Sequence, residues 1–378
     1  MNQRILIYSL LAFTFCSKQN EPSNVSQTSS RNPQIEIQIE GKAKKGFLVG
    51  IEPYLEKTDY QTEDTFYQIL KLYFSYAKKE EIIATERTVI ILPEYIGTWL
   101  VASGEDSKLF EKQTLNDAME ELALNHLGRF LWVFIFEKGY ATDRLRETLF
   151  RMKSWQMAET YQNVFSRLAV EFRVDIVAGS IVLPEPRVVE GKITVTDGPL
   201  QNVSFYFHSD GSVDPKITKK QFLIDEEKTF LSNETKIGNP VYKSPLGLVY
   251  TMICADSWYP EAYEDARNQS AEILVVPSLV APAESWNQKW LGYNGRSAPK
   301  DVNLTDIKNI TEWQAWKKYA LIGKGKQYQI NTAMNVFFNG AIWDLDASGS
   351  AFILMNAKQI SIKKTKGKNL GMIYAIGL

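Results

Sequence analysis

The chain alternates between strand-like and helix-like segments, and this alternation restricts the fold more than any other feature. Apolar, β-branched runs predict buried strands at residues 46–51, 88–94, 174–183 and 193–207. Apolar side chains at helical spacing predict helices at residues 62–79, 114–127 and 142–172. Thr114 is a suitable N-cap for the second helix, and the third strand run is one strand or two strands divided near Gly179. The pattern predicts a two-layer α/β domain without an internal repeat.

Cys254 stands between a predicted strand and a predicted helix. Residues 246–253 have the content of a buried strand, and Pro260 with Glu261 is typical of the first turn of a helix. A thiol near a helix N-terminus has a lowered pKa, because unpaired N–H groups favour the thiolate. Cys254 is therefore a candidate nucleophile. The alternative is a buried, inert cysteine, since free cysteine is often buried.

Two other segments carry groups that a thiol enzyme could use. The strand at residues 88–94 ends on Glu94, and a carboxylate in that position suits acid/base work. Lys219 and Lys220 precede an apolar pair and an acidic cluster that contains Glu226 and Glu227. Taken singly, these segments are ordinary surface features.

In chain order, Glu94, Lys220 and Cys254 resemble the Glu-Lys-Cys triad of the nitrilase superfamily, the carbon-nitrogen hydrolases. The resemblance extends from about residue 45 to the C-terminus, and its most specific part is residues 254–261, Cys-Ala-Asp-Ser-Trp-Tyr-Pro-Glu. It implies an α/β fold, the four-layer αββα sandwich with two central mixed sheets flanked by helices. We expect those four layers to form when two such subunits pack together, which allows a homodimer.

The resemblance also implies a role for each residue. Glu94 would take the thiol proton, and Cys254 would attack the carbonyl carbon to form a thioester that water then hydrolyses. Lys220 and the backbone N–H of Ala255 would hold the developing oxyanion. Glu227 would be the second carboxylate beside the triad. Supporting positions in the motif are Tyr259 and Glu261.

Several positions depart from the family pattern. Phe222 stands where the family often has histidine after its lysine, so Lys219 remains an alternative to Lys220, and Glu226 remains an alternative to Glu227. Trp258 stands where many members carry a polar residue. Ala255 and the following aspartate resemble the amidase branches more than the nitrilase branch. We therefore expect cleavage of a non-peptide amide or carbamoyl bond in a small molecule.

Composition excludes several other classes. The 43 basic and 44 acidic residues give a net charge of −1, which does not favour nucleic-acid binding, and the basic cluster at residues 363–368 is interpreted as a hairpin end. His126 and His208 are the only histidines, and neither is placed for a Cys-His pair. The sequence predicts no metal site and no cofactor. The apolar run at residues 130–136 is too short to span a membrane and is interpreted as core.

The N-terminus resembles a bacterial lipoprotein signal. Arg4 precedes an apolar stretch at residues 5–15, and Cys16 and a polar tract follow. Phe15 departs from the pattern, since a small residue usually precedes the lipidated cysteine. We expect residues 1–16 to be the signal with its lipidation site, residues 17–44 a flexible tether, and residues 45–378 the hydrolase domain. The protein would then be lipid-anchored in the bacterial cell envelope, with the membrane contacted only through Cys16.

Two further interpretations of the N-terminus and two of the function stay open at this point. A plain secretory signal would give a secreted protein, and an uncleaved signal would be an anchor. An N-acyltransferase could use the same triad, and a binding lipoprotein could keep the fold without turnover. Because Cys16 is assigned to the lipid and Cys254 to catalysis, no disulfide is expected.

Overall fold

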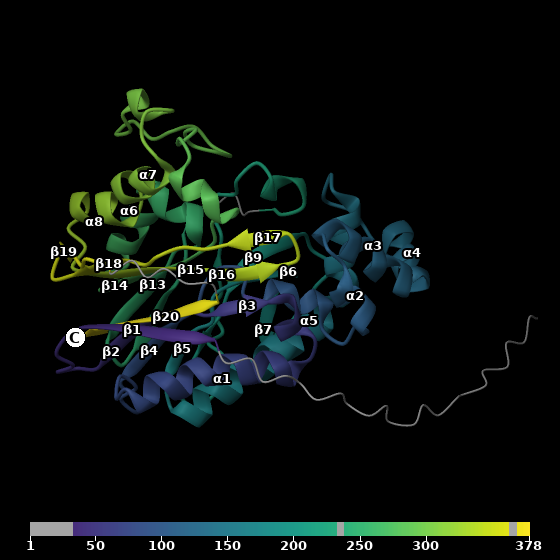
Figure 1. The fold of residues 1–378 in the computed structure, drawn as a ribbon, viewed down its shortest axis with the longest axis horizontal. Coiled ribbons are helices and arrows are strands. Elements are labelled where there is room, and N and C mark those ends of the chain that lie inside the picture. Colours follow the sequence, from purple (N-terminus) through teal and green to yellow (C-terminus); the bar gives the residue numbers. More distant parts are fainter. Residues whose placement is uncertain (1–32, 233–237, 363–368) are drawn as a thin grey trace, which may run out of the picture. The chain divides into compact units, whose positions relative to one another are not determined.

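The structure, a computed structural model, describes residues 33–232, 238–362 and 369–378. Two six-stranded sheets form its centre (Figure 1). In spatial order the first contains β1 (Gln34–Gly41), β20 (Leu370–Gly377), β2 (Phe47–Glu52), β4 (Thr88–Ile91), β5 (Asp175–Val177) and β10 (Tyr206–Phe207). The second contains β12 (Val241–Ser244), β13 (Gly247–Thr251), β14 (Ile273–Ser278), β15 (Thr332–Phe337), β18 (Phe352–Met355) and β19 (Lys358–Gln359).

Helices cover the outer face of each sheet (Figure 1). On the first sheet lie α1 (Glu63–Lys79) and α5 (Arg144–Phe172), and on the second lie α6 (Pro260–Asn268), α7 (Glu312–Tyr319) and α8 (Leu321–Gln327). Beyond the sheets lie α2 (Ser107–Glu111), α3 (Leu115–Asn125) and α4 (Leu127–Phe136). Smaller sheets are formed by β11 (Thr218–Lys219), β9 (Leu200–Ser204) and β6 (Ile181–Pro184), by β17 (Leu345–Ala347), β16 (Asn339–Ile342) and β3 (Tyr54–Glu56), and by β7 (Arg187–Val189) and β8 (Lys192–Thr194).

Alternating residues of the central strands belong to different apolar cores. In β2, Leu48 belongs to the core between the two sheets, whereas Val49 and Ile51 belong to the core under α1 and α5. This alternation follows from the two-residue repeat of a strand. The sheets approach closely at Gly50, where an added Cβ would lie 2.5 Å from a side-chain atom of Met334. The strands are therefore buried on both faces, which explains their continuous apolar sequence.

The four layers are formed within one chain, so the expected two-layer domain, completed by a second subunit, is wrong. The second sheet is built from strands between Val241 and Gln359, in the C-terminal part of the chain. Its strands β13, β14 and β15 are parallel neighbours, and helices connect them. The αββα sandwich itself agrees with the expectation.

The folded unit begins earlier than expected. The predicted tether reached residue 44, but β1 covers Gln34–Gly41 and pairs in parallel with β20 along its whole length. A strand pattern is present in this segment, because Ile35, Ile37 and Ile39 alternate with polar residues, as in a strand with one buried face. The polar residues that flank it favour the prediction of a flexible tether. The domain boundary is therefore corrected from residue 45 to about residue 33.

The apolar run at residues 130–136 is not core, and that prediction is corrected. It lies in α4, where only Val133 is buried. Exposed large apolar side chains of α4 are Leu127, Leu131, Trp132, Phe134, Ile135 and Phe136. These side chains are exposed because α4 lies at the end of the molecule beyond α3, where it packs against α3 and α5 rather than on a sheet (Figure 1). Apolar content alone could not show this.

The predicted helices α1, α3 and α5 are confirmed, and so is the break at Gly179. Thr114 caps α3, accepting a hydrogen bond of 3.1 Å from the N–H of Asp117. Gly179 has a φ of +67° between β5 and β6, and an added Cβ there would lie 2.1 Å from the carbonyl oxygen of Pro93. Only glycine allows this approach, which presses the turn against the segment that carries Glu94.

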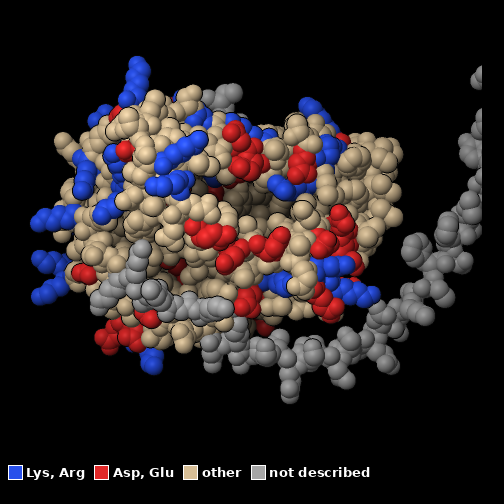
Figure 2. Space-filling view, turned by 45° about the horizontal axis from the view of Figure 1, so that its top comes forward, with Lys and Arg blue, Asp and Glu red and all other residues tan. Residues whose placement is uncertain are grey.

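None of the helices in the described residues has the length and apolar character needed to cross a bilayer. Figure 2 shows acidic and basic side chains interspersed over the face that it presents. Cys16, the signal segment at residues 1–16 and the basic cluster at residues 363–368 lie outside the described residues.

Candidate active site

Three loops bring the predicted triad together at the ends of strands. Glu94 follows β4 by three residues, Lys220 follows β11 directly, and Cys254 opens a 3₁₀ helix, Cys254–Trp258, shortly after β13. All three side chains are buried, with exposed fractions of 1%, 3% and 8% for the whole residues. Residues far apart in the chain thus meet in one cluster, as the resemblance implied.

Lys220 lies between two carboxylates. Its Nζ donates to Glu94 Oε1 at 2.8 Å and to Glu227 Oε1 at 2.7 Å. The structure places Lys220 and not Lys219 in this position, because Lys219 is the last residue of β11 and its backbone N–H donates to Asn239 Oδ1. It also places Glu227 at the ammonium, whereas Glu226 accepts from Asn294 at 3.0 Å.

Glu227 is itself fixed by two further donors. The hydroxyl of Tyr95 donates to Glu227 Oε1, and the N–H of Ile224 donates to Oε2 at 3.1 Å. Tyr95 has a φ of +61°, a left-handed conformation that is costly for a tyrosine. The strain lies next to Glu94, so the backbone there is held by its surroundings in one conformation.

Cys254 has the same kind of strained backbone, with a φ of +50°. The thiol lies beside Glu94, close enough for each group to shift the pKa of the other, and its Sγ donates to the carbonyl oxygen of Leu279 at 3.8 Å. A left-handed residue between a strand and a helix turns its side chain sharply out of the strand direction. The sulfur therefore lies at the cluster and at the cavity described below.

The expected lowering of the thiol pKa is wrong. Burial raises the pKa of Cys254 well above its usual value, and the charge of Glu94 raises it further, while Lys220 acts in the opposite direction. Burial also raises the pKa of Glu94, against the lowering effect of Lys220. The expectation of a lowered pKa rested only on the N–H groups at the helix N-terminus. The buried cluster holds two carboxylates and one ammonium, so a free thiolate would add a second net negative charge.

Two residues of the cluster were missed by sequence reasoning. Asn202, on β9, donates from Nδ2 to Glu94 Oε1 at 3.0 Å. Asp256 accepts from the N–H groups of Gln221, Phe222 and Ile253, each at 2.9 Å, and so joins the lysine loop to the cysteine loop. Asp256 belongs to the cysteine motif, so its position could have been suspected. No local pattern singles out Asn202 among the residues of its strand.

Asp256 should be needed for the position of Cys254. In Asp256→Asn the amide NH₂ replaces one acceptor, so at least one buried N–H loses its partner, at a cost of about 1–3 kcal/mol in the free energy of unfolding. We expect the rate of Cys254 alkylation by iodoacetamide to change at least about fivefold, since the two loops lose their shared anchor. Asp175→Asn is the control, because Asp175 is a buried carboxylate bonded to Tyr206 at 2.6 Å and lies outside this cluster. Equal alkylation rates in both variants would contradict the role.

The other predicted supporting residues surround the cluster. Tyr259 stacks on Phe222 with ring centroids 4.1 Å apart, and Ala255 lines the cavity over the sulfur. Glu261, in the first turn of α6, pairs instead with Arg296 at 2.9 Å. The structure therefore brings Ala255 and Tyr259 to the site and places Glu261 at its edge.

A cavity of about 480 Å³ opens over Cys254. Its walls are mostly apolar and aromatic and include Trp258, Trp290 and Trp316. Two carboxylates, Glu226 and Glu312, also line it. The volume suits a small-molecule ligand rather than a folded protein.

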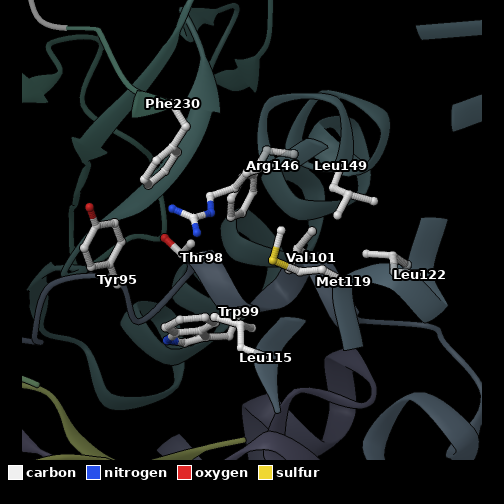
Figure 3. Close-up of a pocket in the computed structure, with 11 residues that line it drawn as sticks. Tyr95, Thr98, Trp99, Val101, Leu115, Met119, Leu122, Arg146, Leu149 and Phe230 are labelled. Atoms are coloured by element: carbon white, nitrogen blue, oxygen red, sulfur yellow. The ribbon is translucent and has the colours of Figure 1, made fainter. Parts of the chain in front are cut away.

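A second, smaller cavity of about 170 Å³ has Tyr95 in its wall (Figure 3). Arg146 reaches into it over the ring of Phe230, with the guanidinium 4.7 Å from the ring centroid. Cys254 does not line this cavity. It is therefore not where a substrate would meet the thiol.

The sequence model of the carbon-nitrogen hydrolases matches residues 60–297, which is more than half of the chain. The chain belongs to the carbon-nitrogen hydrolase family. The matched range contains Glu94, Lys220 and Cys254. As a carbon-nitrogen hydrolase, the protein is an enzyme of the class that acts on carbon-nitrogen bonds.

Solved structures agree on the fold of this carbon-nitrogen hydrolase. A mutant of the Nesterenkonia AN1 amidase from the nitrilase superfamily superposes with a TM-score of 0.52 at 11% identity, covering 88% of this chain and 92% of that one. An amidase from Nesterenkonia sp. gives a TM-score of 0.51 at 11% identity, covering 84% and 86%. At this identity the likeness concerns the fold, which is that of nitrilase-superfamily amidases.

One curated relative matches part of the carbon-nitrogen hydrolase chain. It is the probable hydrolase YhcX of Bacillus subtilis (strain 168), which is 26% identical over 122 residues. The match covers 32% of this chain and 21% of that protein.

Proposed function

We propose that this enzyme hydrolyses a non-peptide amide or carbamoyl bond of a small molecule through a thioester on Cys254. The observation that carries the proposal is the buried cluster in which Lys220 bonds to Glu94 and Cys254 interacts with both charges, beneath a cavity that the sulfur lines. A buried base, a fixed cation and a thiol are the groups that acyl transfer from nitrogen requires.

The raised pKa values favour proton transfer inside the cluster. Moving the thiol proton to Glu94 leaves the net charge of the cluster unchanged, whereas losing it to water would add a negative charge in a buried place. Cys254 would attack the carbonyl carbon as Glu94 takes the proton. The same proton would then pass to the leaving nitrogen, so that the C–N bond breaks and a neutral amine or ammonia departs.

Lys220 suits the developing oxyanion. An ammonium group has three N–H donors, and two of them are used by Glu94 and Glu227, which leaves the third for a substrate oxygen. The backbone N–H of Ala255 would supply a second donor. Water, deprotonated by Glu94, would then attack the thioester, release the carboxylic acid and return the proton to the sulfur.

The test uses the enzyme with a panel of small aliphatic amides and carbamoyl compounds. We expect ammonia and the matching acid in equal amounts, and an intact mass increased by the acyl group on Cys254 when the reaction is stopped early. Acyl product that forms only with an added amine would indicate an acyltransferase. If no compound reacts or acylates the protein, the proposal is refuted.

We also propose that Cys16 carries a lipid anchor that holds the enzyme at the cell envelope. The support is the sequence pattern alone, an apolar stretch followed by a cysteine and a polar tract. Expression in a bacterium with labelled palmitate should label the protein, and Cys16→Ser should remove the label. A labelled Cys16→Ser protein would contradict the assignment.

A further inference from the structure

The charged side chains of the described residues that line the cavity over Cys254 are all acidic. Glu226 and Glu312 line it, and no lysine or arginine is among the described residues that do. Glu226 already has a partner, because it accepts from Asn294 Nδ2 at 3.0 Å. Among the described residues, no side chain of a neighbouring loop donates a comparable hydrogen bond to Glu312.

Glu312 is a half-buried carboxylate without a cation. Trp316 lies next to it, one turn along the same helix, and no basic side chain of the described residues lies within ion-pair distance of it. Burial raises the pKa of Glu312 to about 7, against a lowering effect of Trp316. Removing a carboxylate from water without a compensating charge is unfavourable, so its place in the cavity wall calls for an explanation.

The N-terminus of α7 does not provide one. Thr311 and Gln314 already form a reciprocal cap, with the N–H of Gln314 donating to Thr311 Oγ1 at 3.3 Å and the N–H of Thr311 donating to Gln314 Oε1 at 2.8 Å. Acidic residues in a first helical turn usually keep their charge in water. Glu312 instead turns toward the same cavity as the sulfur.

Aromatic rings complete the environment of a cation site. Trp258 lies nearly perpendicular to Tyr293 and to Trp316, with centroid separations of 5.5 and 5.0 Å. All three line the cavity together with Glu312. Differently oriented rings beside a carboxylate are the surroundings in which an alkylammonium group is bound, by charge pairing and by cation–π attraction.

We propose that the cavity selects amides whose acyl chain ends in a primary ammonium group, with Glu312 and the aromatic rings holding the ammonium while the amide carbonyl reaches Cys254. This proposal rests on the proposed function, because it names the substrate class of the same site. The ammonium supplies the charge that Glu312 lacks, and the apolar walls hold the methylene chain.

The first experiment compares 6-aminohexanamide with heptanamide, which differ by an ammonium in place of a methyl group. We expect the wild-type enzyme to show kcat/KM at least about tenfold higher for the amino compound, the size of a partly desolvated charge interaction. In Glu312→Gln this preference should fall at least about tenfold. Glu284→Gln is the matched control, since Glu284 is exposed in the 3₁₀ helix Ala283–Asn287, next to Ser285 of the cavity wall, but does not line the cavity. That variant should keep the preference.

A binding measurement separates this proposal from the proposed function. Calorimetry with Cys254→Ser should show 6-aminohexanamide binding at least about tenfold more tightly than heptanamide, and adding Glu312→Gln should remove the difference. The wild-type and Cys254→Ser comparisons need no change at Glu312, so they decide even if Glu312→Gln does not fold. Equal binding or turnover of the two amides overturns the cation site. Binding selectivity without hydrolysis would keep the cation site and count against the proposed function alone.

Discussion

Replacing Cys254 by alanine is expected to lower kcat/KM for amide hydrolysis by at least about ten-thousand-fold, to the level of the assay background. Alanine has no atom that can form the thioester, and the remaining groups of the cluster would act only on water. Ammonia release measures the loss, and intact mass should show no acyl adduct.

The variant should remain folded, so the loss can be assigned to chemistry. Alanine carries a Cβ, as cysteine does, and therefore meets about the same strain at a φ of +50°. Thermal unfolding should shift by no more than a few degrees. Cys16→Ser is the matched control for loss of a thiol and should keep full turnover. Hydrolysis that survives in Cys254→Ala would refute the thioester route.

Two members of the triad could be predicted because each follows a local pattern. Cys254 and Glu94 each come three residues after a buried strand, and a strand delivers the residues that follow it to a defined edge of the sheet. Lys220 needed the resemblance, since its neighbours Lys219 and Phe222 gave no local reason to choose it. Only the observed bonds to Glu94 and Glu227 distinguish it from Lys219.

The predictions that were wrong, and the site residues that were missed, depend on contacts between segments that are distant in the sequence. The direction of the Cys254 pKa shift follows from burial and from Glu94, and neither is visible in residues 246–261. Asn202 lies on a strand with no feature of its own, and it reaches Glu94 only because β9 pairs beside β11. The exposed α4 shows the same limit, because apolar content predicts burial only when a surface is present to cover it.

The second large effect is expected for Lys220→Met, which should inactivate the enzyme and also destabilise it. The substitution leaves Glu94 and Glu227 buried without their shared cation, and removal of one partner from a buried ion pair typically costs about 3–5 kcal/mol. In the native protein burial opposes the charge of Lys220, but the carboxylates outweigh it and raise its pKa, so the ammonium persists. Lys219→Met is the matched control and should cost less than about 1 kcal/mol.

The destabilisation should depend on pH in a defined direction. The pKa of Glu94 is already raised in the folded state above its usual 4.5, and loss of the lowering effect of Lys220 must raise it further. A carboxyl group with a raised folded pKa stabilises the fold while it is protonated, and that stabilisation is lost as pH rises through the folded pKa. The difference in unfolding free energy between wild type and Lys220→Met should therefore widen from about pH 5 to about pH 8. Urea unfolding at several pH values measures it, and a gap that is constant or narrows with rising pH would show that Lys220 does not balance the buried carboxylates.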